Sequence, residues 1–212
     1  MKNIPVFTTE NGVATLILKE IPYQQTAYVI LRDSLEPEKL IAECRDFCTA
    51  CGAAHVYAAG HEALERYPFH TAMWEMRCPV DSLEDTDAAL FPVQAETLEI
   101  WRDIYNKKVI HVPNGAWMTA ADGAEMLKKG DGYFIHRGET LLGIGRASGK
   151  MIDWVASVQP GAGREVVLAL AHALSEETAE LTVASTNEKA VRLYERLGFL
   201  KSREHARWFL LS

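Results

Sequence analysis

Hydrophobic positions recur with two periods in the second part of the chain, so strands and helices can be assigned to it. Apolar residues at helical spacing predict helices, and short β-branched or alternating runs between turn residues predict strands. The expected strands lie at 90–93, 132–136, 140–146, 151–158, 180–184 and 199–211, and the expected helices at 95–105, 120–129, 164–174 and 187–197. Their order, β-α-α-β-β-β-α-β-α-β, predicts an α/β domain with an α+β mixed sheet.

The first part of the chain repeats the last six of these elements as a pattern, with little literal sequence in common. Expected strands at 13–21, 26–32, 53–58 and 71–76 alternate with helices at 36–51 and 61–67. The acidic, weakly apolar segment 80–88 reads as a linker. We therefore expect two parts, a partial and degenerate copy at residues 1–80 and a complete domain at residues 85–212.

Composition limits the function classes. The chain has 212 residues, is 48% hydrophobic and carries a formal net charge of -7, which disfavours a sequence-independent nucleic-acid binder. No apolar run approaches the length of a membrane span, and Met1 to Glu10 does not resemble a signal peptide. We expect a cytoplasmic protein without a membrane partner and with reduced thiols. A homodimer is compatible with the sequence.

Three cysteines invite a metal interpretation. Cys44, Cys48 and Cys51 have the spacing C-x3-C-x2-C, which occurs in iron–sulfur and redox sites. The same residues fall on the apolar face of the helix expected at 36–51, where free cysteines act as small buried hydrophobes. We favour the buried helix face and expect no metal, with an iron–sulfur or redox protein as a distant alternative.

A glycine-rich turn follows the strand expected at 151–158. It reads Pro160-Gly161-Ala162-Gly163 and leads directly into an apolar helix. Glycines let several backbone N–H groups approach one anion, and a helix N-terminus adds a favourable dipole. The turn is consistent with pyrophosphate binding, and equally with a tight connection that binds nothing.

The helix expected at 187–197 carries the more specific motif, which ends at Phe199. Asn187 suits the N-cap, and Gly198 suits a left-handed residue that ends the helix. Leu193 and Leu197 lie at i and i+4 and are expected to face the core. Tyr194 then points to the edge of the buried face.

Together, the turn and this helix resemble the GNAT superfamily of N-acetyltransferases. The segment Asn187–Phe199 matches the family pattern N-x-x-A-x-x-L-Y-x-x-x-G-F at every fixed position. The resemblance covers the chain from about Leu90 to its C-terminus. It implies a GNAT-like acyl-CoA N-acyltransferase fold, preceded here by the partial GNAT-like half, in which two parallel strands diverge and acyl-CoA lies between them.

The resemblance also implies residue roles. Val158 would pair its backbone with the pantetheine arm, Asn187 would hydrogen-bond near it, and Tyr194 would protonate the departing thiolate. The pyrophosphate would bind the backbone N–H groups of Gly161, Ala162, Gly163 and Arg164. The turn departs from the family pattern because it is short and lacks the usual basic residue. That departure bears on the strength of CoA binding and not on the fold.

A base must deprotonate the attacking ammonium, since amine pKa values lie near ~10. Asp153 is the nearest acid in sequence, although a solvent-facing strand acid is its simpler interpretation; Glu165 reads as a first-turn helix acid. The acceptor pocket is expected near Trp101, Tyr105, Trp117 and Met118, which are equally compatible with core positions.

We therefore expect an enzyme that transfers an acyl group, acetyl in the simplest case, from acetyl-CoA as co-substrate to a primary amine. The acceptor is a small molecule or a peptide, and its identity does not follow from the sequence. The rival is a non-catalytic acyl-CoA-binding or protein-interaction module of the same fold. The first part of the chain offers no glycine-rich turn, since Arg32-Asp33-Ser34-Leu35-Glu36-Pro37 stands there. We expect it to shape the acceptor site or an interface.

Overall fold

The computed structural model describes residues 5–212 and forms two compact units. Within the described residues, the first comprises 5–73 and His205–Ser212, and the second comprises Trp74–Glu204. Two long strands, β5 (Phe69–Pro79) and β11 (Leu200–Leu210), contribute residues to both units.

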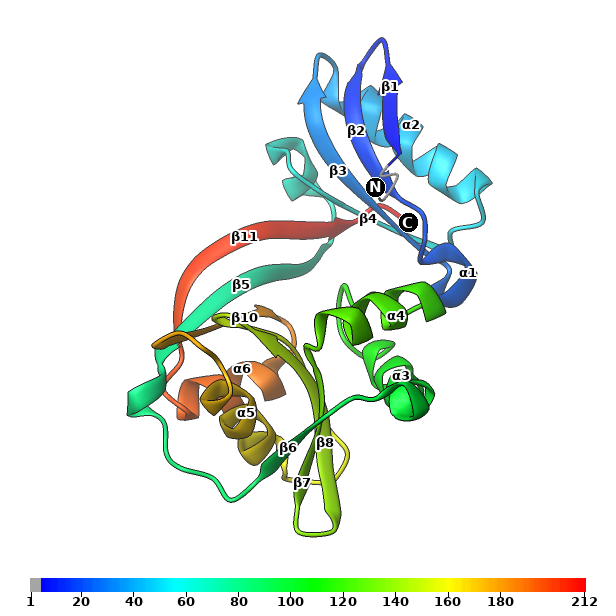
Figure 1. Ribbon diagram of the computed structural model, residues 1–212. Helices are drawn as coiled ribbons and strands as arrows, with labels where there is room; N and C mark the ends of the chain where they lie inside the picture. The colour runs from blue at the N-terminus through cyan, green and yellow to red at the C-terminus, as the bar shows by residue number, and fades with distance from the viewer. Residues whose placement is uncertain (1–4) are drawn as a thin grey trace. The chain divides into compact units, whose positions relative to one another are not determined.

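The first unit is a sheet covered on one face by a helix (Figure 1). Its remaining elements are β1 (Val6–Thr9), β2 (Gly12–Ile17), α1 (Ile21–Gln24), β3 (Thr26–Ser34), α2 (Pro37–Ala50), β4 (His55–Ala59) and the 3₁₀ turn η1 (Glu62–Arg66). The strand order is β1-β2-β3-β4-β11-β5, and β3 and β4 are parallel. Helix α2 buries Leu40, Ile41, Cys44 and Cys48 against this sheet.

The second unit is a mixed sheet with helices on both faces. Its elements are η2 (Val80–Ser82), β6 (Ala89–Pro92), η3 (Ala95–Thr97), α3 (Leu98–Val109), α4 (Ala120–Lys129), β7 (Gly132–Arg137), β8 (Thr140–Ser148), β9 (Met151–Ser157), α5 (Gly163–His172), β10 (Thr178–Ala184) and α6 (Glu188–Arg196). The strand order is β6-β7-β8-β9-β10-β5-β11. Helices α5 and α6 pack in one hydrophobic core, and α3 and α4 pack in another with Ile144 and Ala156.

Each unit takes one strand from the other part of the sequence. In the second unit β5 lies between β10 and β11, and in the first unit β11 lies between β4 and β5. Phe209 and Leu210 of β11 pair with Ala58 and Tyr57 of β4. The expected linear division into residues 1–80 and 85–212 stays a prediction, while the compact units follow this exchange of strands.

The expected fold class is confirmed, and most elements lie within a few residues of their expected bounds. The strand expected at 13–21 ends at Ile17, because Ile21 begins the short helix α1 with Pro22 in its first turn. The expected closing strand at 71–76 is the middle of the longer β5. Strand β1 lies in the described residues but was not expected from the pattern.

Candidate functional site

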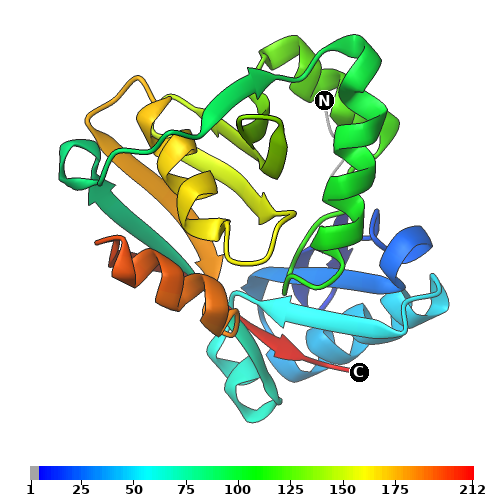
Figure 2. The ribbon, with the colours of Figure 1, turned by 90° about the horizontal axis from the view of Figure 1, so that it is seen from below.

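The parallel strands β9 and β10 diverge in the second unit. They pair only at Glu180 with Met151 and Leu181 with Ile152, although β9 continues to Ser157 and β10 to Ala184. In Figure 2, β9 (yellow) and β10 (orange) diverge. The pairing confirms the expected divergence, which leaves backbone groups of β9 without a strand partner on that side.

A β-bulge lies one residue beyond the last parallel pair. Arg146 of β8 pairs with Trp154 and Ala147 pairs with Ile152, so Asp153 is the extra residue on β9. Bulges redirect side chains and are frequent beside active sites. The bulge therefore places Asp153 at the base of the divergence, where the strand register could not be fixed from the sequence.

Three charged groups determine the electrostatics at Asp153. The side chain reaches the surface, but the surrounding protein removes part of the carboxylate's hydration and raises its pKa. The positive charges of Arg146 and, less strongly, Lys129 lower the pKa, and the negative charge of Asp131 raises it; the net direction is upward. A raised pKa brings a carboxylate closer to the working range of a general base.

The glycine-rich turn is held by hydrogen bonds to β8. The N–H groups of Val158 and Gln159 donate to the carbonyl oxygen of Leu142, at 2.8 and 3.2 Å. Because Val158 uses its N–H in this way, that group is not available to a pantetheine arm. Residues of an antiparallel pair alternate in direction, so the backbone N–H and C=O of Ser157 point away from β8 and toward the divergence.

Helix α5 begins at the end of this turn and exposes its first amides. The N–H of Val166 donates to the carbonyl of Ala162 at 3.1 Å. Within the described part of the chain, the N–H groups of Gly161, Gly163, Arg164 and Glu165 donate to no protein acceptor. Such amides and the helix dipole favour an anion. The Arg164 guanidinium pairs with Glu84, so the residue's expected contribution rests on its backbone.

The two turn glycines differ in conformation. Gly161 has a φ of 81°, in the left-handed region, and a Cβ there would meet no atom within 4 Å. Gly163 is the first residue of α5 and has no positive φ; a Cβ there would lie 3.1 Å from Cδ2 of Leu193. Only Gly161 therefore uses the left-handed conformation that glycine favours.

Asn187 caps helix α6, whose end is also as expected. Its side-chain oxygen accepts a hydrogen bond from the N–H of Ala190 at 3.4 Å. Gly198 has a φ of 94°, and the N–H groups of Gly198 and Phe199 donate to the carbonyls of Glu195 and Tyr194. These bonds form a Schellman motif. The capping role of Asn187 leaves its amide nitrogen for the expected contact with pantetheine, which stays a prediction.

Tyr194 is more buried than expected. Its side chain lies in the core shared by α5 and α6, and its ring centroid is 6.0 Å from that of Phe199. Leu193 and Leu197 are only partly buried. Burial raises the pKa of Tyr194 to about 12. Its hydroxyl thus stays protonated at neutral pH, and no hydrogen bond to it occurs among residues 5–212.

The expected acceptor residues divide into core and loop positions. Trp101 is fully buried and donates from Nε1 to the carbonyl of Tyr133 at 2.9 Å, so it is a core residue. Tyr105 donates its hydroxyl to the carbonyl of Ala116 at 2.9 Å and packs against Trp154 at 4.6 Å between ring centroids. Met118 is also buried, and Trp117 is partly buried.

The expected buried helix face is observed for Cys44 and Cys48 and is wrong for Cys51, because α2 ends before it. Cys44 and Cys48 are buried on α2, and Cys51 is exposed at its C-terminal end. Burial raises the pKa of Cys44 to about 12 and that of Cys48 to about 11, which opposes the thiolate form that a metal requires. No group of three or more potential metal ligands occurs among residues 5–212.

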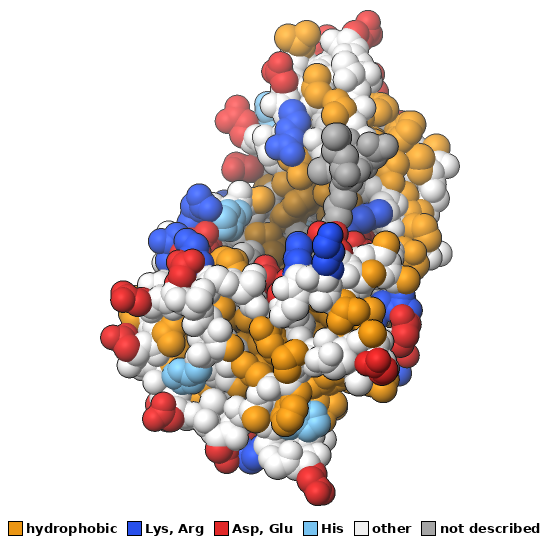
Figure 3. Space-filling model, viewed as in Figure 1, with side chains coloured by type: hydrophobic (Ala, Val, Ile, Leu, Met, Phe, Trp, Pro, Cys, Tyr) orange, Lys and Arg blue, Asp and Glu red, His pale blue; other side chains and the backbone are white. Residues whose placement is uncertain are grey.

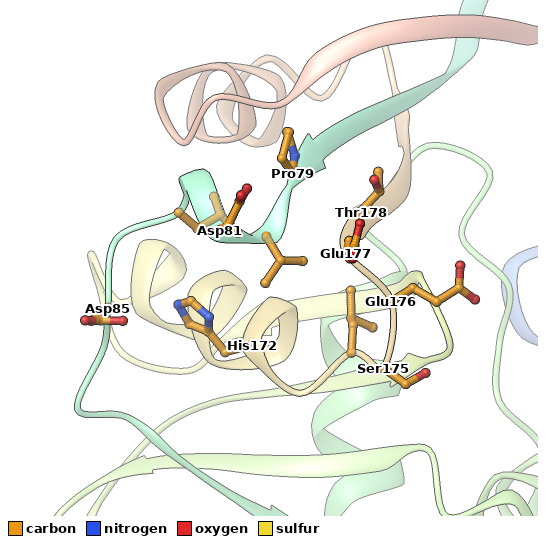
Figure 4. A pocket seen from close by; sticks show the side chains of 11 residues that line it. Pro79, Asp81, Asp85, His172, Ser175, Glu176, Glu177 and Thr178 are labelled. Carbon is orange, nitrogen blue, oxygen red and sulfur yellow. The ribbon is translucent and has the colours of Figure 1, made fainter.

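A shallow recess lies at the other end of α5. It encloses about 710 Å³ and is lined by acidic residues and by His172, as Figure 4 shows. None of the residues expected to bind CoA lines it. Elsewhere on the surface, acidic and basic side chains are interspersed over the face seen in Figure 3. No helix within the described residues is long and apolar enough to cross a membrane.

The first unit has no comparable opening. Strands β3 and β4 pair at five positions, from Thr26 with His55 to Ile30 with Ala59. In the turn before α2, the N–H groups of Leu35 and Glu36 donate to the carbonyl of Asn11 at 2.9 and 3.2 Å. The protein's own carbonyl thus occupies two amides of this turn.

Comparison with known proteins agrees with this geometry. A family model described as FR47-like protein matches residues 157–209, which include the turn, α5 and α6. A functionally unknown conserved protein from Staphylococcus epidermidis ATCC 12228 has a TM-score of 0.63 at 12% identity, over 98% of this chain and 94% of its own. A search of curated proteins found no match.

Two further solved structures carry descriptive names. A GCN5-related N-acetyltransferase from Sphaerobacter thermophilus has a TM-score of 0.52 at 14% identity, over 93% of this chain and 75% of its own. A tandem GNAT protein from the clavulanic acid biosynthesis pathway has a TM-score of 0.53 at 14% identity, over 94% and 78%. The chain has the fold of the GCN5-related N-acetyltransferases, which confirms the resemblance, and the tandem protein fits a two-half arrangement.

Proposed function

We propose that the protein is an acyl-CoA-dependent N-acyltransferase that moves an acetyl group from acetyl-CoA to a primary amine in its second unit. The observation that carries the proposal is the early end of β9–β10 pairing beside a turn with unpaired amides. An extended pantetheine arm needs an unpaired strand, and a pyrophosphate needs N–H donors. Both occur together here.

In this proposal the pyrophosphate binds the turn and the first turn of α5. The donors are the N–H groups of Gly161, Gly163 and Arg164, and that of Ala162 contributes if it releases its 3.3 Å bond to Gln159. The pantetheine arm pairs with β9 through Ser157 and, two residues earlier, Val155. The thioester then lies toward Asp153, because the strand runs from the bulge to the turn.

The chemistry requires only protein side chains and the two substrates. Asp153 accepts a proton from the bound ammonium, and the freed nitrogen lone pair attacks the thioester carbon. A C–N bond forms, the tetrahedral intermediate collapses, and the C–S bond breaks with its electron pair leaving on sulfur. The nitrogen loses its second proton to give the amide, the thiolate takes up that proton to give free CoA thiol, and Asp153 returns its proton to solvent. Binding both reactants in one cleft supplies proximity.

Tyr194 is proposed to stabilise the departing sulfur. Alkyl thiols such as that of cysteine have pKa values near ~8.5. A hydroxyl with a pKa of about 12 therefore transfers its proton to a thiolate only uphill, but it can donate a hydrogen bond to the developing charge. The expected role of proton donor becomes the weaker role of hydrogen-bond donor.

The rival function is a non-catalytic acyl-CoA-binding or interaction module. The short turn favours it, because fewer residues surround the phosphates than the family pattern provides. The carboxylate at the bulge favours the enzyme, because CoA binding alone has no use for a carboxylate of raised pKa.

Two measurements on the full chain separate these functions. Isothermal titration calorimetry with acetyl-CoA should give one site per chain. Mass spectrometry should then detect acetylated product and free CoA in a panel of amines, amino acids and peptides. Saturable binding without product from any acceptor would favour the non-catalytic module, and absence of binding would refute both.

A further inference from the structure

A second carboxylate binds Arg146, the cation with the largest effect on the Asp153 pKa. Asp131 lies between α4 and β7 and is only 5% exposed. Its two carboxylate oxygens accept hydrogen bonds from Arg146, at 2.6 Å from Nη2 and 3.3 Å from Nε. The main-chain carbonyl of Asp131 accepts a third bond, from the N–H of Ala147 at 3.0 Å. Asp131 is therefore bonded to both Arg146 and Ala147, the two residues of β8 that flank the bulge.

Arg146 has two carboxylates within its influence but bonds to one. It stands opposite the bulge that contains Asp153, and the charge of Arg146 acts on that carboxylate. Within the described residues, no ion pair joins Arg146 to Asp153. A guanidinium that already binds both oxygens of one carboxylate cannot offer the same fork to another.

We propose that Asp131 is a positioning residue that holds Arg146 away from Asp153, so that the carboxylate at the bulge stays without an ion-pair partner and can accept a proton. This inference rests on the proposed function only for its catalytic meaning. The arrangement of the three side chains is a property of the folded protein that can be measured without any substrate.

The other charged groups around the bulge are already paired. Lys129 at the end of α4 lies 3.2 Å from Glu125. On β10, Glu180 is bonded to Lys150 and to Arg77, each at 3.0 Å. Of the two cations that lower the Asp153 pKa, Arg146 has the larger effect and Lys129 the smaller, and the opposing effects of Arg146 and Asp131 agree with this arrangement.

Neutralising Asp131 and neutralising Arg146 should shift the pKa of Asp153 in opposite directions. In Asp131→Asn, Arg146 loses its partner charge and turns to Asp153, and a like charge also disappears; both effects lower the Asp153 pKa. In Arg146→Gln, the nearby cation disappears and the pKa rises. Asp87→Asn is the matched control, because Asp87 also binds an arginine, Arg137, at 2.9 Å but is not among the groups that act on Asp153.

The experiment is a carbon-13 NMR titration of aspartate carboxyls in the full chain, with Asp153→Asn used to assign the Asp153 signal. We expect a lower midpoint in Asp131→Asn, a higher one in Arg146→Gln and no change in Asp87→Asn. An unchanged or raised midpoint in Asp131→Asn would overturn the proposal. If circular dichroism shows that this variant does not fold, Arg146→Gln decides: a midpoint that does not rise overturns it.

The pH dependence of activity gives a second measurement, which would not change if Asp131 had only a structural role. If the protein transfers acetyl groups, the acid limb of its kcat/KM profile should follow the NMR midpoints, to lower pH in Asp131→Asn and to higher pH in Arg146→Gln. A lower kcat/KM whose acid limb keeps the midpoint of the parent counts against the proposal. NMR shifts as expected in a protein without transferase activity would support the positioning and reject the proposed function.

Discussion

The two units contain the same strand–turn–helix arrangement, but the parallel strands stay paired in the first and diverge in the second. In the first unit β3 and β4 stay paired along all of β4, while in the second β9 and β10 pair at two positions only. Gly60 continues the close approach in the first unit, since a Cβ there would lie 2.5 Å from the carbonyl oxygen of Leu31. The first unit therefore closes the space that the second leaves open.

The turn and the bulge of the first unit are also less suited to an anion and to a general base than those of the second. Pro37 occupies the first turn of α2 and has no N–H, and Glu36 and Glu38 add negative charge beside the remaining amides. The bulge of β3 leaves Arg32 unpaired with β2, where the bulge of β9 leaves Asp153. An arginine stays protonated and cannot act as a base at neutral pH. Strand pairing, amide partners and one side chain thus distinguish the unit in which we propose binding and reaction from the unit in which we do not.

The largest expected effect comes from exchanging the bulge residues for neutral amides. Asp153→Asn removes the proposed base and should lower turnover by about 100-fold, the lower end for general base catalysis. Arg32→Gln, its matched variant in the first unit, should leave turnover unchanged. Steady-state thiol release with one accepted amine measures both, and equal losses in the two variants would contradict the assigned difference between the units.

The same variant has an expected stability signature. Since folding raises the pKa of Asp153, the ionised carboxylate lowers the stability of the folded protein above that pKa. Asp153→Asn should therefore melt at the same or a higher temperature than the parent at pH 7. This gain should vanish below the ordinary aspartate pKa of 3.8, where folded and unfolded chains are both protonated. Calorimetry at the two pH values tests the sign.

The next effect concerns the turn. Gly161→Val forces a β-branched residue to a φ of 81°, which costs about 1–3 kcal/mol and should weaken acetyl-CoA binding by about tenfold or more. Gly138→Val imposes similar strain at a φ of 54°, also with open space for a Cβ, in the β7–β8 turn. Calorimetry should show the loss for Gly161→Val alone. Equal affinities of the two variants would make the turn an ordinary connection.

Tyr194→Phe should have a smaller effect on rate. The pKa of about 12 limits the hydroxyl to hydrogen bonding, so we expect a loss of about tenfold in turnover with little change in acetyl-CoA affinity. The melting temperature should not fall, because the ring keeps its packing against Phe199. A proportionate loss of affinity would instead make Tyr194 a binding residue.

The smallest expected effect is in the first unit. Glu36→Gln removes one acid from the turn before α2, but the N–H groups of Leu35 and Glu36 remain bonded to Asn11. Acetyl-CoA stoichiometry should stay at one and affinity should change by less than about twofold, since exposed single charges contribute little. A second calorimetric site in this variant would show that charge alone separates the two units.

The sequence predicted features that depend on local spacing. The motif from Asn187 to Phe199 gave the bounds of α6, its cap and its terminating glycine, because capping chemistry is contained within a few residues. The turn before α5 also followed from local order, and the divergence of the strands followed from the family resemblance that these motifs carry. These elements are enough to establish the fold and to place the candidate site on it.

Features that depend on distant partners could not be predicted. The exchange of β5 and β11 joins segments far apart in the chain, and the bulge at Asp153 depends on its register with β8. The hydrogen bonds from Arg146 to Asp131 also depend on that register. Tyr194 is one position from the expected core face, but the packing of Phe199 and α5 buries it.

The central claim is that acyl-CoA binds the second unit and not the first, and amide NMR tests it directly. The protein has 14 glycines, so nitrogen-15 glycine labelling gives few signals with probes in both units. Titration with acetyl-CoA should shift the signals of Gly161 and Gly163 saturably and leave those of Gly12 and Gly60 in place. Shifts at Gly12 or Gly60 with none at Gly161 and Gly163 would contradict the account.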